Sequence, residues 1–100
     1  MKPVVFLPEA EQEMLEAARY YESQATYLGI DFLSEIERDV NSIAELPMTW
    51  PVIESELRRR LVRRFPLGIL YRIEPEEIVI VAVAHLRRKP GYWRERIKRK

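Results

Sequence analysis

Arginine is the residue type in this chain whose number and spacing point most directly to chemistry. Five arginines fall between positions 58 and 64, and further cations follow later in the chain. A guanidinium binds two oxygens of a phosphate or carboxylate at once, so such a set is typical of a surface for a polyanion or an acidic partner. A solvated or salt-bridged sheet surface is the alternative. The cations assigned to this surface are Arg58, Arg60, Arg63, Arg64, Arg72, Arg88 and Lys89.

His85 is the single histidine of the chain, and it stands two residues before Arg87. A histidine in such a place is either a structural residue or a proton donor and acceptor near neutral pH. Beside Arg87 and Tyr92 it could serve metal-free cleavage of an RNA backbone. That reaction needs a base for the 2′-hydroxyl, a cation on the phosphate and an acid for the leaving oxygen. Tyr92 and Trp93 could also offer stacking faces to unpaired bases.

Other kinds of chemistry find little support in the sequence. The chain has no cysteine and one histidine, which leaves no thiolate nucleophile and no zinc ligand set. It has no glycine-rich phosphate loop. The glutamates at 9, 11, 13 and 16 are interpreted as a solvated helix face rather than a metal site. We therefore expect neither a metal nor a cofactor.

The charges are divided unevenly along the chain. Residues 1–56 hold 3 Lys or Arg against 12 Asp or Glu, whereas residues 57–100 hold 14 against 4. This division favours either a polyanion on the basic part or neutralisation of one half by the other within the fold. A chain of 100 residues is expected to form a single domain over 1–100. Without an apolar run of membrane-spanning length or a secretory signal, we expect a cytoplasmic protein that does not enter a membrane.

The pattern of apolar residues predicts the elements that must position these side chains. A strand over 4–7 is followed by one helix that begins at Pro8 and stops at Gly29, and by a second helix from Asp31 to Leu46. Residues 48–56 are predicted to be a loop. Strands are expected over 57–65, 69–73 and 78–86, and residues 92–100 form a short helix or a tail.

The run of seven apolar residues from Ile78 to Ala84 predicts a central strand that is buried on both faces. Strand, two helices and three strands in this order give an α+β fold, in which the helical pair covers one face of a small antiparallel sheet. The opposite face is expected to be open, and the arginines are expected to gather there.

Several segments, taken in order, carry a resemblance that covers nearly the whole chain. The C-terminal ones are FPLGILYRI over 65–73 and IVIVAVAHLRRKPGYW over 78–93. The N-terminal ones are FLPEA, ARYYE, LGIDF and the pair LP and WP, which begin at residues 6, 18, 28, 46 and 50. In this order they closely resemble the RelE/ParE superfamily of bacterial toxins, the toxin halves of type II toxin–antitoxin modules, often described as plasmid stabilisation proteins.

The resemblance implies the same β-α-α-β-β-β fold and a cognate antitoxin. The antitoxin's acidic or amphipathic C-terminal segment would fold on the toxin as it binds. One branch of the superfamily cuts messenger RNA on the ribosome, and another poisons DNA gyrase and has no established nuclease site. The expected function is growth inhibition by one of these two routes, and the alternative is a non-enzymatic gyrase poison or a decayed-toxin binding module.

The nuclease branch implies roles for particular residues. Arg87 matches a phosphate-binding arginine, and Tyr92 or Trp93 falls where the late aromatic lies. Gly68 stands where the ribonucleases commonly carry an arginine, a departure for which Arg72, on the same strand face, could substitute. The stretch over 85–93 looks more like the ParE-like side.

Overall fold

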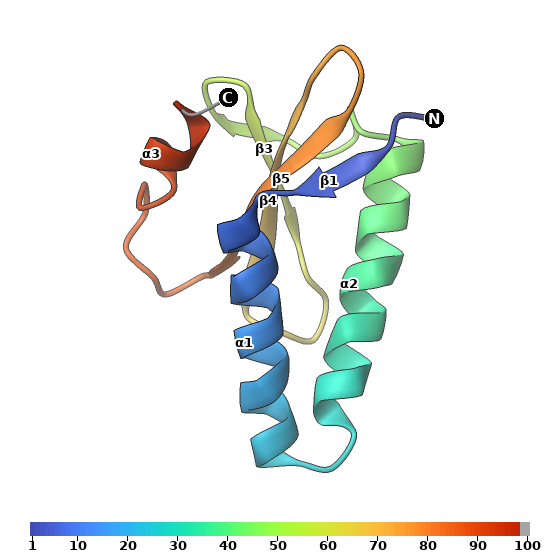
Figure 1. The fold of residues 1–100 in the computed structure, drawn as a ribbon, viewed down its shortest axis with the longest axis vertical. Helices are drawn as coiled ribbons and strands as arrows, with labels where there is room; N and C mark the ends of the chain where they lie inside the picture. Colours follow the sequence, from blue (N-terminus) through green and yellow to red (C-terminus); the bar gives the residue numbers. More distant parts are fainter. Residues whose placement is uncertain (99–100) are drawn as a thin grey trace.

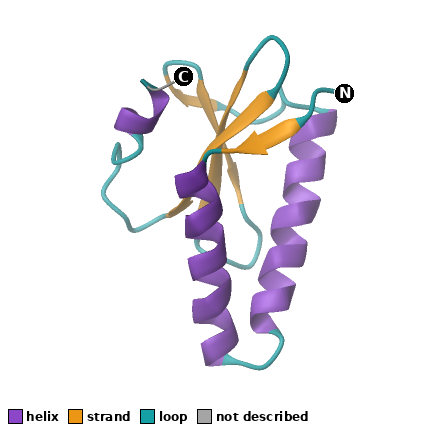
Figure 2. Cartoon of the chain, viewed as in Figure 1, coloured by secondary structure: helices purple, strands orange, loops and turns teal. Residues whose placement is uncertain are grey.

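The computed structural model describes residues 1–98 and has an α+β architecture (Figure 1). Two long helices pack on one face of a five-stranded sheet of order β1-β5-β4-β3-β2, and a short C-terminal helix lies apart from them (Figure 2). This confirms the predicted order of strand, helical hairpin and antiparallel meander. The strands are β1 (Val4–Phe6), β2 (Val52–Glu54), β3 (Leu57–Leu61), β4 (Leu67–Ile73) and β5 (Ile78–His85), and the helices are α1 (Pro8–Gln24), α2 (Leu28–Glu45) and α3 (Arg94–Ile97).

β5 is the central strand of the sheet, as its apolar run predicts. Residues Ile78–Ala84 are buried, and the strand pairs in parallel with β1 and antiparallel with β4. Ile80 and Val83 face the core under the helices, whereas Val79 and Val81 face the opposite side of the sheet. A register shift opposite the step from Leu70 to Tyr71 leaves Val81 as an extra residue, so that Val81 and Ala82 both face the side away from the helices.

The helical hairpin has other boundaries than those predicted. α1 begins at Pro8, where a missing N–H costs nothing, and Glu9 and Glu11 lie in its first turn. α2 begins at Leu28 rather than near Asp31, because the Glu22 carboxylate accepts the backbone N–H groups of Tyr27 and Gly29 at 2.9 and 3.0 Å. This acceptor satisfies two donors that the start of a helix leaves free.

Gly29 is not the helix stop that the sequence predicts, since the left-handed residue of this turn is Tyr27, with φ of 69°. Gly29 lies inside α2, where a Cβ atom would stand 2.5 Å from the carbonyl oxygen of Ala18 in α1. The glycine is therefore required by the close approach of the two helices.

The segment predicted to be a loop over 48–56 contains strand β2, which pairs antiparallel with β3 and forms one edge of the sheet. The predicted strand over 57–65 ends earlier, at Leu61, because residues 63–64 turn towards β4 and Arg64 adopts a positive φ of 70°. The prediction of a loop was wrong because β2 has only three residues and follows a proline, so its alternation of apolar and polar residues is too short to be recognised.

The face of the sheet opposite α1 and α2 is not open. Trp93 is buried against Leu57, Leu70, Val79 and Val81, and parts of the C-terminal segment pack with it. The expectation of an exposed second face is therefore wrong, because the segment after β5 folds back over the sheet. The predicted helix or tail over 92–100 contains the short α3, and residues 99 and 100 lie outside the described residues.

Candidate functional site

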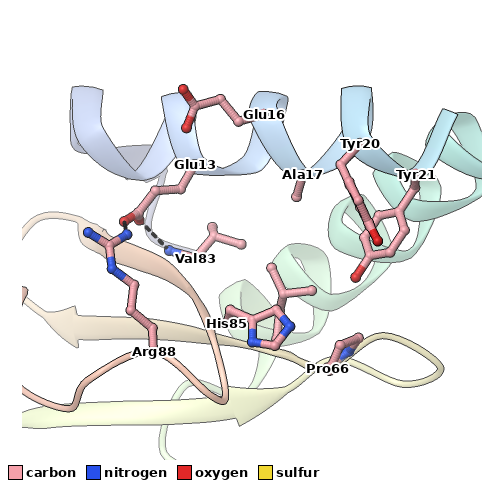
Figure 3. A pocket seen from close by; sticks show the side chains of 10 residues that line it. Glu13, Glu16, Ala17, Tyr20, Tyr21, Pro66, Val83, His85 and Arg88 are labelled. Carbon is pink, nitrogen blue, oxygen red and sulfur yellow. Dashed lines mark hydrogen bonds and ion pairs between the residues drawn. The ribbon is translucent and has the colours of Figure 1, made fainter. Parts of the chain in front are cut away.

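An open groove runs between α1 and the C-terminal half of β5 (Figure 3). Its volume is about 550 Å³, and its walls combine small apolar side chains with aromatic rings and a few charges. It lies beyond the end of β1, which pairs with β5 only as far as Ile80. We call it the α1–β5 groove, and its walls include Glu13, Ala17, Tyr21, Leu67, Val83 and His85.

Glu13 joins α1 to β5 and to the C-terminal segment. Its carboxylate accepts the backbone N–H of Val83 at 3.0 Å, a group left without a strand partner where β1 ends. It also accepts two hydrogen bonds of 2.9 Å from the Arg96 guanidinium and one of 3.3 Å from Arg88. Only 11% of the Glu13 side chain is exposed, so this carboxylate is a buried structural centre rather than part of a solvated face.

Sequence reasoning missed Glu13, although a signal was present. Position 13 is three residues after Ala10 and four before Ala17, so it lies on the apolar side of α1. A glutamate in that stripe must have a partner in the fold, because burying an unpaired charge is costly.

Tyr92 lies outside the α1–β5 groove and is held by cations. Its ring centre is 3.6 Å from the Arg88 guanidinium carbon and 5.0 Å from that of Arg96. Burial, with the nearby Glu13 carboxylate as a smaller cause, raises the pKa of Tyr92 to about 12. At neutral pH this phenol keeps its proton, so it cannot act as a base.

The three residues predicted to perform RNA cleavage do not all line the α1–β5 groove. His85 is exposed on the α1–β5 groove, and its Nδ1 accepts the backbone N–H of Arg87 at 3.0 Å. Figure 3 shows the imidazole between the pair of Glu13 and Arg88 on one side and Pro66 on the other. The side chains of Arg87 and Tyr92 are not among those that line this groove.

The strand arginines do not converge on an open face, so that expectation is also wrong. Arg58 and Arg60 share a face, but it is the face towards the helices. Arg58 donates to the Trp50 carbonyl at 2.6 Å. Arg60 pairs with the fully buried Asp39 at 2.9 Å, and its guanidinium lies 4.4 Å from the Trp50 ring centre.

Arg72 lies on the other face, but it is buried and bound to Glu74 at 2.7 Å and to the Ile97 carbonyl at 3.3 Å. Arg72 therefore does not supply a free guanidinium in place of the arginine that the ribonucleases commonly carry at the position of Gly68.

The remaining predicted cations lie in two turns. Arg63 and Arg64 are exposed in the turn between β3 and β4, and Arg64 lies 4.0 Å from Asp31. Arg87 and Lys89 are exposed in the turn that follows β5. Arg88, from the same turn, is tied to Glu13.

Two further features of residues 1–98 bear on function. Within them, no three His, Cys, Asp or Glu side chains are grouped so that they could hold a metal ion. None of the described helices is long and apolar enough to cross a membrane.

Comparisons with known proteins agree with this architecture. A family model described as the ParE toxin of the type II toxin–antitoxin system, parDE, matches residues 4–90. A solved structure titled as the chromosomal ParDE TA system from P. aeruginosa superposes with a TM-score of 0.63 at 15% identity, over 86% of this chain and 97% of that one. No curated protein matches. The structural likeness shows the fold, and the family match extends over most of the chain. The chain therefore belongs to the family of ParE toxins of type II toxin–antitoxin systems.

Proposed function

We propose that this protein arrests bacterial growth by binding DNA gyrase rather than by cutting messenger RNA. The dispersal of the candidate cleavage residues supports this choice. RNA cleavage needs a base, a cation and an acid around one phosphate, within hydrogen-bonding reach. His85 lines the α1–β5 groove, Tyr92 packs against the Arg88 and Arg96 guanidinium groups outside that groove, and Arg87 is exposed in the turn after β5.

The second part of the proposal is neutralisation by a cognate antitoxin. The α1–β5 groove supports it, because this groove has apolar walls at Ala17 and Val83 and lies near exposed cations of the turn at Arg87 and Lys89. An acidic or amphipathic segment that folds on binding matches this combination. Both gyrase and the ribosome are inside the cell, so the protein acts in the cytoplasm.

Cleavage of messenger RNA is the alternative, and one observation favours it. His85 is exposed, and among residues 1–98 its ring makes a hydrogen bond through Nδ1 but none through Nε2. Arg87 follows two residues later. In this alternative His85 exchanges the proton, Arg87 holds the phosphate and Tyr92 assists the leaving group.

Induction of the protein in a bacterial host separates these possibilities. We expect growth arrest accompanied by DNA breaks and an SOS response, while transcripts stay intact. Co-expression of the small gene next to the toxin gene should restore growth. Under the gyrase proposal, His85→Ala should arrest growth as the wild type does. Transcripts cut upon induction, with loss of cutting in His85→Ala and Arg87→Ala, would reject the gyrase proposal. Normal growth with abundant soluble protein would indicate a decayed toxin.

A further inference from the structure

Strand β2 forms the edge of the sheet opposite β1, and its outer side has no strand partner among residues 1–98. Val52 in β2 is 48% exposed, and two apolar side chains of the segment that leads into β2, Leu46 and Met48, are 64% and 70% exposed. The function proposed above uses none of these three residues. We call β2 together with these side chains the β2 edge. A strand edge beside exposed apolar side chains is a surface on which another strand can pair.

The backbone of Val52 points outward from this edge. Val52 pairs with Arg58 of β3. The hydrogen bond beside this pair runs from the Arg59 N–H to the Pro51 carbonyl at 3.1 Å. In an antiparallel ladder, a pair flanked by such a bond directs its own N–H and C=O groups to the other side of each strand. Val52 therefore offers one donor and one acceptor to a further strand.

The features that commonly protect a strand edge are weak at β2. Proline blocks an edge where the N–H that it lacks would point outward. Pro51 stands one residue before Val52, so its nitrogen is on the side of β3. An unpaired charge would also repel a partner, but the Glu54 carboxylate accepts two hydrogen bonds of 2.7 Å from the Arg94 guanidinium. The irregular pairing beyond Val52 only limits the open edge to a few residues.

We propose that β2 pairs antiparallel with β2 of a second copy of this chain, about a two-fold axis at Val52. The Val52 N–H of each copy donates to the Val52 carbonyl of the other, so both outward groups are satisfied at once. Pairing of this kind is closed, because it uses the same surface on both copies. The two Val52 residues then face each other with their Cα atoms about 5.5 Å apart.

The charges near the β2 edge agree with this two-fold arrangement. Arg58 reaches along the segment before β2, where its guanidinium donates to the carbonyls of Met48 and Trp50 at 3.3 and 2.6 Å. The other end of β2 is acidic, with Glu54 and the exposed Glu56. Because antiparallel pairing reverses the direction of the strand, the acidic end of each copy lies beside the Arg58 of the other. Parallel pairing would instead bring like charges together.

The contact is small, so the dimer should be weak. A strand of three residues with its neighbouring apolar side chains is too short to form a large interface. Stable interfaces bury ~1,200 Å² or more, so we expect a dissociation constant on the order of 100 μM. The α1–β5 groove of each copy stays open, because β2 and β5 are separated by two strands of the sheet. Each copy in the dimer therefore keeps its own site for an antitoxin segment.

Sedimentation velocity and amide NMR test this pairing in the wild-type protein. The measured mass should rise from one copy towards two between about 5 and 500 μM protein, a range that brackets the expected constant. The Val52 amide signal should move with the same concentration dependence. The amide signal of Val5, in the middle of the other edge strand β1, should stay in place. A constant mass and a fixed Val52 signal over this range would overturn the proposal.

Charged substitutions at Val52 give a sharper test, because this residue faces its own copy across the axis. Val52→Lys and Val52→Glu should each weaken self-association about tenfold or more, since each places like charges opposite one another. An equimolar mixture of the two variants should associate again, because opposite charges then meet. Val5→Lys, the matched change in β1, should leave self-association unchanged. Val52 is exposed, so both variants should keep the fold, which circular dichroism checks.

Three results would contradict pairing through β2. The first is self-association that survives in both Val52 variants or is lost in Val5→Lys. The second is a mixture of the two Val52 variants that stays as dissociated as either alone. The third is a Val52 amide that moves only when the antitoxin is added to dilute toxin, which would assign the β2 edge to the antitoxin. These readouts involve neither gyrase nor growth, so failure of the dimer is distinguishable from failure of the proposed function.

Discussion

Glu13→Gln tests how the C-terminal segment is held to the rest of the fold. The Glu13 carboxylate receives two hydrogen bonds of 2.9 Å from Arg96, and these two side chains are only 11% and 12% exposed. Removing one partner of a buried ion pair costs about 3–5 kcal/mol, since the remaining charge is left unpaired. Glutamine keeps an oxygen for the Val83 N–H, so we expect the lower end, about 3 kcal/mol. For a domain of this size, that lowers the Tm by about 12 °C or more.

Urea denaturation followed by tryptophan fluorescence and circular dichroism measures this loss. Glu16→Gln is the matched control, because Glu16 is an exposed acid on the same helix and accepts a 3.4 Å hydrogen bond from the Gln12 amide. It should change stability by less than about 0.5 kcal/mol. The double variant with Arg96→Gln should cost clearly less than the sum of the single variants. Equal effects of Glu13→Gln and Glu16→Gln, or strict additivity with Arg96→Gln, would refute the reasoning and leave the Arg94–Glu54 pair and the packing of Trp93 to hold the segment.

Three further predictions concern the helical hairpin, a buried ion pair and a buried phenol. Gly29→Ala should lower stability by about 2 kcal/mol in urea, since its Cβ meets the Ala18 carbonyl and outweighs the better helix propensity of alanine. Arg60→Met should lower the free energy of unfolding by about 3 kcal/mol, and by more than Asp39→Asn does. The reason is that burial already raises the pKa of Asp39, and Arg60 supplies the main opposing effect. A smaller loss of stability in Arg60→Met than in Asp39→Asn, measured by thermal unfolding, would contradict this. Tyr92 should ionise near pH 12, seen as the phenolate absorbance that Tyr92→Phe lacks. Because the folded state keeps this proton, stability should fall as the pH rises from about 10 towards 12, and less so in Tyr92→Phe.

Much of the fold follows from local patterns in the sequence. Seven consecutive apolar residues over 78–84 predict the central strand, and steps of three and four predict both long helices. Strand β2 was not predicted, because it is defined by its pairing with β3 and not by an alternation of apolar residues in its own sequence. The start of α2 was also missed, since its cap is the Glu22 side chain from the preceding helix.

The candidate site was harder to predict than the fold. Alternation correctly puts Arg58 and Arg60 on the same face of β3, but alternation alone does not say which face. The answer was present in α2, where Asp39 lies three residues after Ile36 and four before Ile43, on the apolar side of the helix. A buried aspartate needs a cation, and Arg60 provides it.

The fold-back of the C-terminal segment could not be predicted from local sequence. It depends on Glu13, Glu54 and Trp93, which meet residues of that segment or of the sheet only after folding. As a result, the face expected to bind a target is covered, and exposed cations lie in the turns at Arg63, Arg64, Arg87 and Lys89.

The measurement that tests the proposed function most directly uses purified protein with purified gyrase and plasmid DNA. Gyrase cleavage or supercoiling is followed on gels, and a parallel in vitro translation reaction reports the integrity of messenger RNA. The gyrase proposal predicts trapped, broken plasmid or lost supercoiling, together with intact transcripts. Unaffected gyrase alongside ribosome-dependent cutting of the transcript would contradict it.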